Sequence, residues 1–426
     1  MIEEVMLIKV NTEENNNKFY YIKLDGQTVT KRYGRINDIN TTKGTIRVSQ
    51  GGSYEYNDTK RKKLNKGYVE SEIQQKEEVK TNNNLKDIVL EQIDHKDTKS
   101  KNLLLYLIQE NIHNIVNSTQ IKFNENTGVF STPLGIVKKS GIIKAERILG
   151  QIETIIRKKD DDNFTNQEER EVRELNENYL SIIPTKIKNL REFDSLINSL
   201  YKISEQKDIC KALITSLDLI ENSQGIPSKE DKDKTIYFNT TMASLKNKKE
   251  IKEVEYYFEK SKNHHHGYKL RNSKIINIFK INIDKEKKEY RSRLSNQMKL
   301  WHGTRVGNIL SILKSSLLMP KASPGQRTAA MFGNGLYFSN QSTNSMNYCD
   351  GMFWNSSEKK KSIFIFLCSI AMGKYQVPKH NTQSNPNKGY HSYWAKPDET
   401  ARILNDEMII FNNNQIKIDY LIEIKI

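Results

Sequence analysis

The chain has 426 residues, 28% of them charged and 36% hydrophobic, which is enough to build cores in two or three domains. The formal net charge is +16, and residues 231–426 hold 32 basic against 17 acidic side chains, so that part attracts polyanions such as DNA, RNA, dinucleotides or phosphate polymers. Three distant cysteines exclude a disulfide-stapled scaffold and a CxxC-type zinc site, and no apolar run reaches the length of a membrane span.

Residues 1–50 alternate polar and apolar side chains, which predicts β-strands over about 5–10, 18–24, 28–33 and 45–48. Asp25-Gly26 lies between two of these runs and is typical of a hairpin turn. The basic run Lys60–Lys63 follows. It has two interpretations, a set of phosphate contacts or the solvated end of a helix.

Residues 71–84 are polar without an apolar period and are predicted to be a linker. Apolar residues then recur at helical spacing, so we expect an all-α bundle of about six helices. Pro133 and Gly135 are expected to open one helical region, and Pro184 to close another. The predicted helices cover about 85–93, 103–115, 142–156, 175–183, 190–203 and 209–220.

Gly225 and Pro227 indicate a second boundary, beyond which strand patterns return. Thr304 is a candidate N-terminal capping residue for the second of two helical patches. The strands are expected at about 275–283, 336–338, 363–368, 408–411 and 416–426, with helical patches at 254–258 and 306–317.

Three motifs in the last third carry the most information. They are LWHGTR at 300–305, MFGNGLYFS at 331–339 and SMNYC at 345–349. A lone histidine near a strand end is usually structural, and an Asn-Gly can be a plain turn, but the three motifs in this order are specific. Together they resemble the catalytic domain of the poly(ADP-ribose) polymerase family.

The resemblance implies a His-Tyr-Glu triad made of His302, Tyr337 and Glu407. Glu399 and Glu423 are the other glutamates near the C-terminus, but only Glu407 falls at the family's position without a gap. The plainer alternatives are a strand-edge carboxylate for Glu407 and a buried core tyrosine for Tyr348. The residues implied to bind NAD+ are His302, Gly303, Thr304, Asn308, Tyr337, Ser345 and Tyr348.

The likeness extends upstream of the catalytic motifs. Segments 132–139 and 175–184 resemble landmarks of the family's helical regulatory domain, and Tyr33, Gly34 and Arg35 stand where a WGR domain has its signature triplet, with Tyr in place of Trp. We therefore expect a multidomain α+β protein. Its parts are a β-rich WGR domain at 1–80, an all-α regulatory bundle at 85–222 and a mixed α/β ADP-ribosyltransferase domain with a split β-sheet core at 228–426.

By this resemblance the protein is a nuclear poly(ADP-ribosyl)transferase that uses NAD+ as substrate and is activated by DNA breaks. Its partners would be 5′-phosphorylated DNA ends or nicks and acceptor proteins, itself included, and off DNA it would be a monomer without membrane contact. Tyr33, Gly34 and Arg35 would contact the DNA. Three alternatives stay open: a mono-ADP-ribosyltransferase, an NAD+ hydrolase, and a catalytically weak reader of DNA ends or ADP-ribose.

Other features are expected to be unrelated to the chemistry. His264–His266 could suggest a metal site, but adjacent residues on a strand point to opposite faces and no acidic or cysteine partner lies at ligand spacing. We therefore predict a loop there and no metal. Two departures from the family do bear on the chemistry: Leu318 replaces an arginine that many members have near the adenine side, and Asn344 replaces a lysine near the acceptor side, so acceptor preference and polymer length are not implied by the resemblance. We expect no signal peptide, because MIEEVMLIKV has no basic start followed by an apolar stretch.

Overall fold

The structure is a computed structural model that describes residues 2–36, 44–70, 85–125, 129–132, 135–158, 163–224, 238, 240–263, 265–319, 331–350, 352, 362–379, 385–397, 399–400 and 403–426. The chain forms two compact units. The first consists of Met1–Asn84 and Ile112–Ile220, and the second of Leu85–Asn111 and Glu221–Ile426. The predicted linker at 71–84 and the boundary at Gly225 and Pro227 lie outside the described residues.

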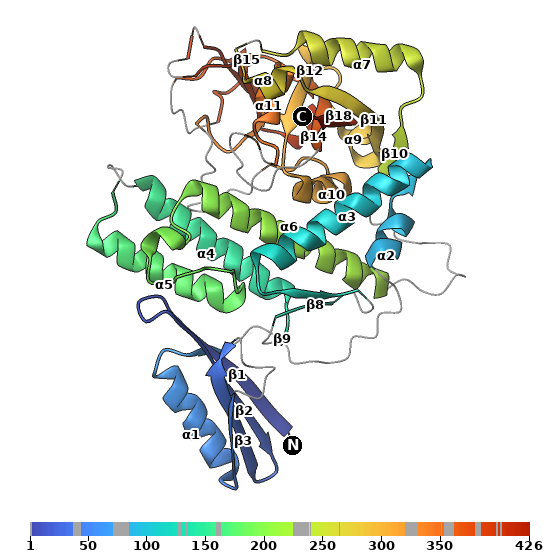
Figure 1. Ribbon diagram of the computed structural model, residues 1–426. Helices are drawn as coiled ribbons and strands as arrows, with labels where there is room; N and C mark the ends of the chain where they lie inside the picture. Colours follow the sequence, from blue (N-terminus) through green and yellow to red (C-terminus); the bar gives the residue numbers. More distant parts are fainter. Residues whose placement is uncertain are drawn as a thin grey trace. The chain divides into compact units, whose positions relative to one another are not determined.

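The N-terminal part of the first unit is a five-stranded antiparallel sheet with one helix against it (Figure 1). Its order is β4-β3-β2-β1-β5, with β1 (Ile2–Asn11), β2 (Asn16–Asp25), β3 (Thr28–Arg35), β4 (Thr45–Ser49), β5 (Val69–Glu70) and helix α1 (Gly52–Leu64). The four predicted strands and the hairpin are confirmed. Gly26 has a φ of 60°, a conformation that glycine adopts without strain.

The helical region begins with α2 (Leu85–Gln92) and α3 (Thr98–Ser118) and continues with α4 (Lys139–Lys158), α5 (Asn166–Ile182) and α6 (Leu200–Gln224). Thr165 starts α5 with a capping box, in which Thr165 and Glu168 satisfy each other's backbone amides. The helix ends before Pro184, as predicted. A small sheet of β7 (Lys122–Asn124), β8 (Val129–Thr132) and β9 (Gly135–Ile136) precedes α4, so the helix expected to open at Pro133 and Gly135 begins only at Lys139.

The predicted helix over 190–203 is wrong. Residues 190–199 hold only the short 3₁₀ turn Phe193–Ser195, and α6 begins at Leu200 and runs on through the next predicted helix. The side chain of Asn176 explains this, because its Oδ1 accepts from the Ile197 amide at 2.8 Å and its Nδ2 donates to the Ile197 carbonyl at 3.2 Å. A buried side chain therefore satisfies backbone groups that a helix would otherwise pair.

The second unit contains two sheets that meet at one corner. The six-stranded sheet has the order β12-β14-β18-β11-β10-β6, and the four-stranded sheet the order β13-β17-β16-β15. The larger sheet is made of β6 (Asp94–His95), β10 (Thr240–Ser244), β11 (Lys274–Ile283), β12 (Gln297–Gly303), β14 (Ser362–Ala371) and β18 (Ile416–Lys425). The smaller sheet is made of β13 (Leu336–Phe338), β15 (Tyr375–Gln376), β16 (Ser392–Ala395) and β17 (Glu407–Ile410).

Short helices complete this unit. They are α7 (Lys248–Lys260), α8 (Tyr268–Arg271), α9 (Asp284–Glu289), α10 (Val306–Ser315) and α11 (Ser342–Met346). The five predicted strands and two helical patches of this part are confirmed. A core of Phe258, Trp301, Ile365, Leu367 and Ile422 lies against the larger sheet. The fold is therefore multidomain α+β with a split sheet, as expected.

Residues 85–111 join the catalytic sheet through β6, which pairs in parallel with β10. Asp97 fixes this junction, because its two carboxylate oxygens accept hydrogen bonds from the amides of Ser100 at 2.9 Å and Ser244 at 2.7 Å. The first amide belongs to the opening turn of α3 and the second to β10. A half-buried carboxylate therefore links the start of α3 to β10, beside the pairing of β6 with β10.

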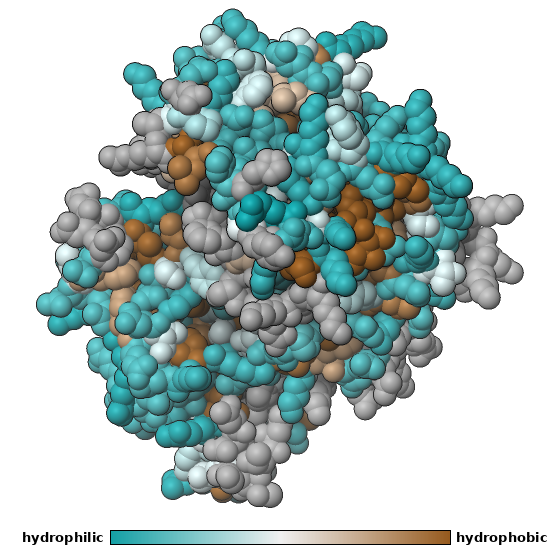
Figure 2. Space-filling view, turned by 45° about the horizontal axis from the view of Figure 1, so that its top comes forward, coloured by the Kyte–Doolittle hydropathy of each residue, from teal (hydrophilic) through white to brown (hydrophobic). Residues whose placement is uncertain are grey.

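Hydrophilic side chains predominate on the face that Figure 2 shows, in keeping with the charged composition. None of the helices in the described part of the chain combines the length and the hydropathy that a membrane crossing requires.

Candidate active site

The predicted site residues gather around a small cavity of about 70 Å³ in the second unit. Six of the eight predicted catalytic and NAD+-binding residues line it, and Thr304 and Asn308 lie outside it. Phe338 and Ser339, which were not predicted, and Asn344, which stands where many family members have a lysine, complete the wall. The lining residues are His302, Gly303, Tyr337, Phe338, Ser339, Asn344, Ser345, Tyr348 and Glu407.

His302 lies near the end of β12, next to the corner where the two sheets meet. Trp301 and Ser339 exchange two backbone hydrogen bonds there, of 2.8 and 3.0 Å, which fix β12 against the end of β13. The imidazole Nδ1 of His302 donates to the carbonyl oxygen of Tyr337 at 2.9 Å. A neutral ring held in this way keeps Nε2 as the nitrogen with acceptor capacity.

Gly303 is fixed by the space around it. A Cβ atom at this position would lie 1.7 Å from the carbonyl oxygen of Ser345 and 2.6 Å from its carbonyl carbon. Both are backbone atoms of α11 that no side-chain rotation can move. Only glycine therefore fits, and its bare backbone leaves room for a close-bound ligand.

Tyr337 holds the segment before its own strand. Its hydroxyl accepts from the Phe332 amide at 2.9 Å and donates to the Gly333 carbonyl at 3.1 Å. Its strand β13 pairs with β17, with Tyr337 opposite Ile409. Because Glu407 begins β17, this register brings the tyrosine and the glutamate to the same cavity.

Glu407 is largely enclosed, and burial raises the pKa of its carboxyl to about 7. A group with this pKa can hold or release a proton near neutral pH, as general acid-base chemistry requires. Tyr348 lines the same cavity and exposes 43% of its surface.

Thr304 directly follows the cavity residue Gly303, and Asn308 lies in the first turn of α10. Asn308 Nδ2 donates to Thr304 Oγ1 at 3.2 Å. The prediction that Thr304 caps α10 is wrong, because Arg305 is the capping residue and makes no side-chain cap. Asp350 accepts from the Val306 amide at 2.6 Å instead, and its carboxylate suits the positive end of the helix dipole.

The predicted DNA-binding residues Tyr33, Gly34 and Arg35 lie at the end of β3 in the first unit, whereas Glu407 begins β17 in the second.

Tyr33 belongs to a cluster of aromatic and cationic side chains on the N-terminal sheet. Its ring stacks on Tyr20, with the centroids 5.0 Å apart and the planes within 5°. The ammonium of Lys63 lies 3.9 Å from the Tyr20 centroid, and the guanidinium of Arg47 lies 5.9 Å from that of Tyr33. Stacked rings flanked by cations suit contacts with nucleic acid.

The basic run at 60–63 turns out to be the last turn of α1, which was one of its two interpretations. Lys60 pairs with Glu70 at 3.0 Å, and Arg61 and Lys62 pair with Asp58 at 2.9 and 2.7 Å. Lys63 instead lies over the tyrosine cluster. Of the four residues, Lys63 is therefore placed best to meet a phosphate beside the rings.

The described residues contain no group of three histidine, cysteine, aspartate or glutamate side chains arranged to hold a metal ion. His264 lies outside the described residues. The Nδ1 of His266 lies 2.8 Å from the Thr343 hydroxyl, so this ring takes part in packing the segment against α11.

Three family models match the chain in succession. They are the WGR domain at residues 3–75, the poly(ADP-ribose) polymerase regulatory domain at 101–241 and the poly(ADP-ribose) polymerase catalytic domain at 248–402. Every residue of the small cavity except Glu407 falls within the last match.

Similar curated proteins carry related names. A poly [ADP-ribose] polymerase 2 of Zea mays is 25% identical over an alignment that covers 99% of this chain and 70% of that protein. A poly [ADP-ribose] polymerase 2 of Caenorhabditis elegans is 33% identical over 30% of this chain and 27% of its own length. A protein mono-ADP-ribosyltransferase of Mus musculus is 31% identical over 35% of this chain and 8% of its own. The chain thus spans less than a third of the nematode and mouse proteins.

Proposed function

The chain belongs to the poly(ADP-ribose) polymerase family, and from this premise we propose that it is an NAD+-dependent poly(ADP-ribosyl)transferase activated by DNA breaks. One observation carries the proposal. The triad residues His302, Tyr337 and Glu407 are far apart in sequence but line one cavity. The wall of this cavity includes Gly303, a position where only glycine fits. This is the arrangement that positioning and cleaving a dinucleotide requires.

The cavity would take the nicotinamide end of NAD+. The backbone of Gly303 would hold the carboxamide, and the Ser345 hydroxyl would donate to it. The rings of Tyr337 and Tyr348 would flank the nicotinamide. His302, together with Thr304 and Asn308 beside it, would bind the adenosine part.

Glu407 would carry the chemistry. Cleavage of the bond between nicotinamide and ribose builds positive charge on the ribose, which a nearby carboxylate stabilises. The positively charged substrate would in turn favour the ionised form of Glu407 and lower its pKa from the raised value of the empty site. The carboxylate would then accept a proton from the attacking hydroxyl.

The full triad favours chain elongation over single transfer, because family members limited to single transfer usually lack the glutamate. The acceptors would be proteins, this one included, and then the hydroxyls of ADP-ribose already attached. We further propose a nuclear location and a monomeric state off DNA.

DNA dependence is proposed to come from the N-terminal sheet. Tyr33, Gly34 and Arg35, with Lys63 beside them, would contact a 5′-phosphorylated end or nick. The helical domain would restrict access of NAD+ until DNA binding shifts its population towards a looser state.

The experiment is a gel of products from labelled NAD+, with and without nicked, 5′-phosphorylated DNA. A ladder or smear that DNA stimulates supports the proposal. A single band indicates a mono-transferase, free ADP-ribose a hydrolase, and no turnover a reader domain, and each of these three results contradicts it.

A further inference from the structure

Glu407 lies where one of its two neighbouring strands stops. On one side β17 pairs with β16, and Glu407 lies opposite Ala395. On the other side β13 ends at Phe338, which lies opposite Met408, so among the described residues Glu407 has no strand partner there. Contacts other than the sheet ladder must therefore set the position of this carboxylate on that side.

Two side chains continue the register past the end of β13. Counting on from the last pair of β13 and β17, Asn340 falls opposite Asp406. The Ser339 hydroxyl donates to the Asp406 carbonyl at 3.4 Å, and Asn340 Nδ2 donates to Asp406 Oδ2 at 2.8 Å. The residue directly before Glu407 is thus held through both its backbone and its carboxylate.

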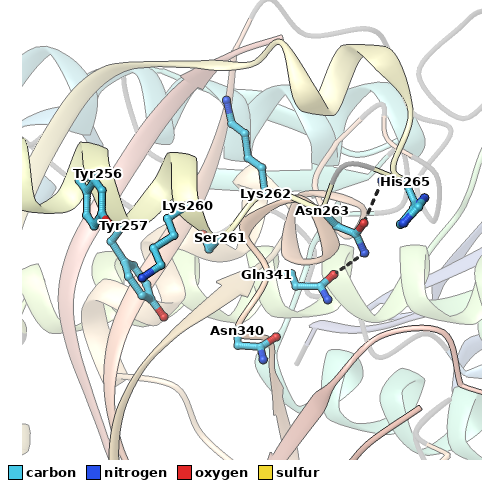
Figure 3. A pocket seen from close by; sticks show the side chains of 9 residues that line it. All are labelled: Tyr256, Tyr257, Lys260, Ser261, Lys262, Asn263, His265, Asn340 and Gln341. Atoms are coloured by element: carbon cyan, nitrogen blue, oxygen red, sulfur yellow. Dashed lines mark hydrogen bonds between the residues drawn. The ribbon is translucent and has the colours of Figure 1, made fainter. Parts of the chain in front are cut away.

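The segment that carries these donors is itself anchored on both sides of Asn340. Ser339 exchanges two backbone hydrogen bonds with Trp301 of β12, of 2.8 and 3.0 Å. On the other side, the side chain of Gln341 accepts from Asn263 Nδ2 at 3.0 Å (Figure 3). The Gln341 amide also donates to Ser339 Oγ at 3.0 Å. Asn340 therefore extends from a backbone whose two neighbouring residues are fixed.

The chemistry of the pair decides which group donates. An ionised carboxylate only accepts, and in a side-chain amide only the nitrogen donates, so the contact requires Asn340 as donor and Asp406 as acceptor. Hydrogen bonds to an ionised group are stronger than those between neutral groups. Both side chains are half-buried, so water weakens this bond only in part.

We propose that Asn340 is a positioning residue for the transfer reaction. Through Asp406 it holds the start of β17, so that the Glu407 carboxylate stays in the cavity with the other two triad residues. A displacement of about 1 Å in a reacting group can cost about a hundredfold in rate. This role rests on the proposed function, in which Glu407 carries the chemistry.

The test exchanges donor and acceptor in the full-length chain. Asn340→Asp removes the bond and places two carboxylates together, whereas the double variant of Asn340→Asp and Asp406→Asn restores the bond with the roles reversed. Asn387→Asp makes the same change at an exposed position and is the control. For each variant, kcat and KM for labelled NAD+ are measured with nicked DNA present, and thermal unfolding gives the folded fraction.

We expect Asn340→Asp to lower kcat about thirtyfold or more and to change KM less than about threefold, because the carboxylate is displaced while the rest of the site is kept. The double variant should recover most of the lost kcat, and the control should match wild type. A wild-type kcat in Asn340→Asp, or a double variant as slow as Asn340→Asp, overturns the proposal. A fall in kcat that only follows the folded fraction would assign Asn340 to stability and overturns it too.

A second measurement separates this proposal from the proposed function. Burial raises the pKa of Glu407 to about 7, and ¹³C NMR of labelled glutamate, assigned with Glu407→Gln, follows this titration without any transfer. Loss of the bond in Asn340→Ala should let the carboxylate reach water and lower its pKa by about half a pH unit or more. An unchanged pKa overturns the positioning role, whereas wild-type protein without turnover refutes the proposed function and leaves this titration to decide the pair.

Discussion

The backbone of Gly303 approaches the carbonyl oxygen of Ser345 so closely that a Cβ atom there would lie 1.7 Å from it. This contact joins the end of β12 to α11 and closes one wall of the cavity that also holds His302 and Glu407. Because the contact is between backbone atoms, side-chain rotation cannot relieve it. It therefore fixes the spacing between β12 and α11 at the site.

Gly303→Ala should therefore abolish activity and lower the melting temperature by several degrees, because either β12 or α11 must shift. Gly267→Ala is the matched control, since nothing lies within 4 Å of a Cβ there, and it should behave as wild type. Thermal unfolding and labelled-NAD+ turnover measure the two effects. Normal activity in Gly303→Ala would show that the wall does not have this geometry.

Glu407→Gln should lower turnover by at least about a hundredfold while changing the Kd for NAD+ by less than about threefold. In the wild type, turnover at subsaturating NAD+ should fall as the pH drops below about 7, because protonation removes the carboxylate. Glu399→Gln, on an exposed glutamate paired with Lys396, should leave both quantities unchanged. Retained turnover in Glu407→Gln would mean that another carboxylate acts.

Glu286 should make stability depend on pH. Burial raises the pKa of this carboxyl to about 7, although Ser316 and the Ile418 amide donate to it. Between about pH 4.5 and 7 the folded state binds the proton and the unfolded state does not. The free energy of unfolding therefore falls by about 3 kcal/mol as the pH rises through this range, and it is flat above pH 7. Urea midpoints at several pH values should show that Glu286→Gln removes this fall. The same pH dependence in wild type and variant would contradict the assignment.

Asp97 should make the free energy of unfolding depend on pH in the opposite direction to Glu286. Burial opposes its ionisation, but hydrogen bonds from the Ser100 and Ser244 amides outweigh that and lower the pKa to about 2. The stability that this adds, about 2 kcal/mol, is present above about pH 4 and is lost as the pH falls towards 2. Asp97→Ala should lower the free energy of unfolding by that amount at pH 7, whereas exposed Asp87→Ala should not. Equal effects of the two variants would show that Asp97 does not fix the junction.

The sequence patterns predicted the strands and most helices, because the spacing of apolar residues reflects which face of each element is buried. Apolar residues alternate with polar ones in strands and recur every three to four positions in helices. They failed at 190–203, where Leu196 and Ile197 are buried but the backbone bonds to Asn176 instead of forming a helix. They also missed the Asp350 cap, because it joins residues 44 positions apart. The motifs located most of the cavity, but no local pattern records contacts that support its wall, such as the hydrogen bond that Asn405 Nδ2 donates to Asn344 Oδ1 at 3.4 Å.

The central claim is tested most directly by the initial rate at which label from NAD+ enters protein-bound polymer in the full-length chain. The account predicts that nicked, 5′-phosphorylated DNA raises this rate at least tenfold and that the product is a ladder of increasing length. A rate that is zero with DNA present, or one that yields only free ADP-ribose or a single attached unit, would contradict it.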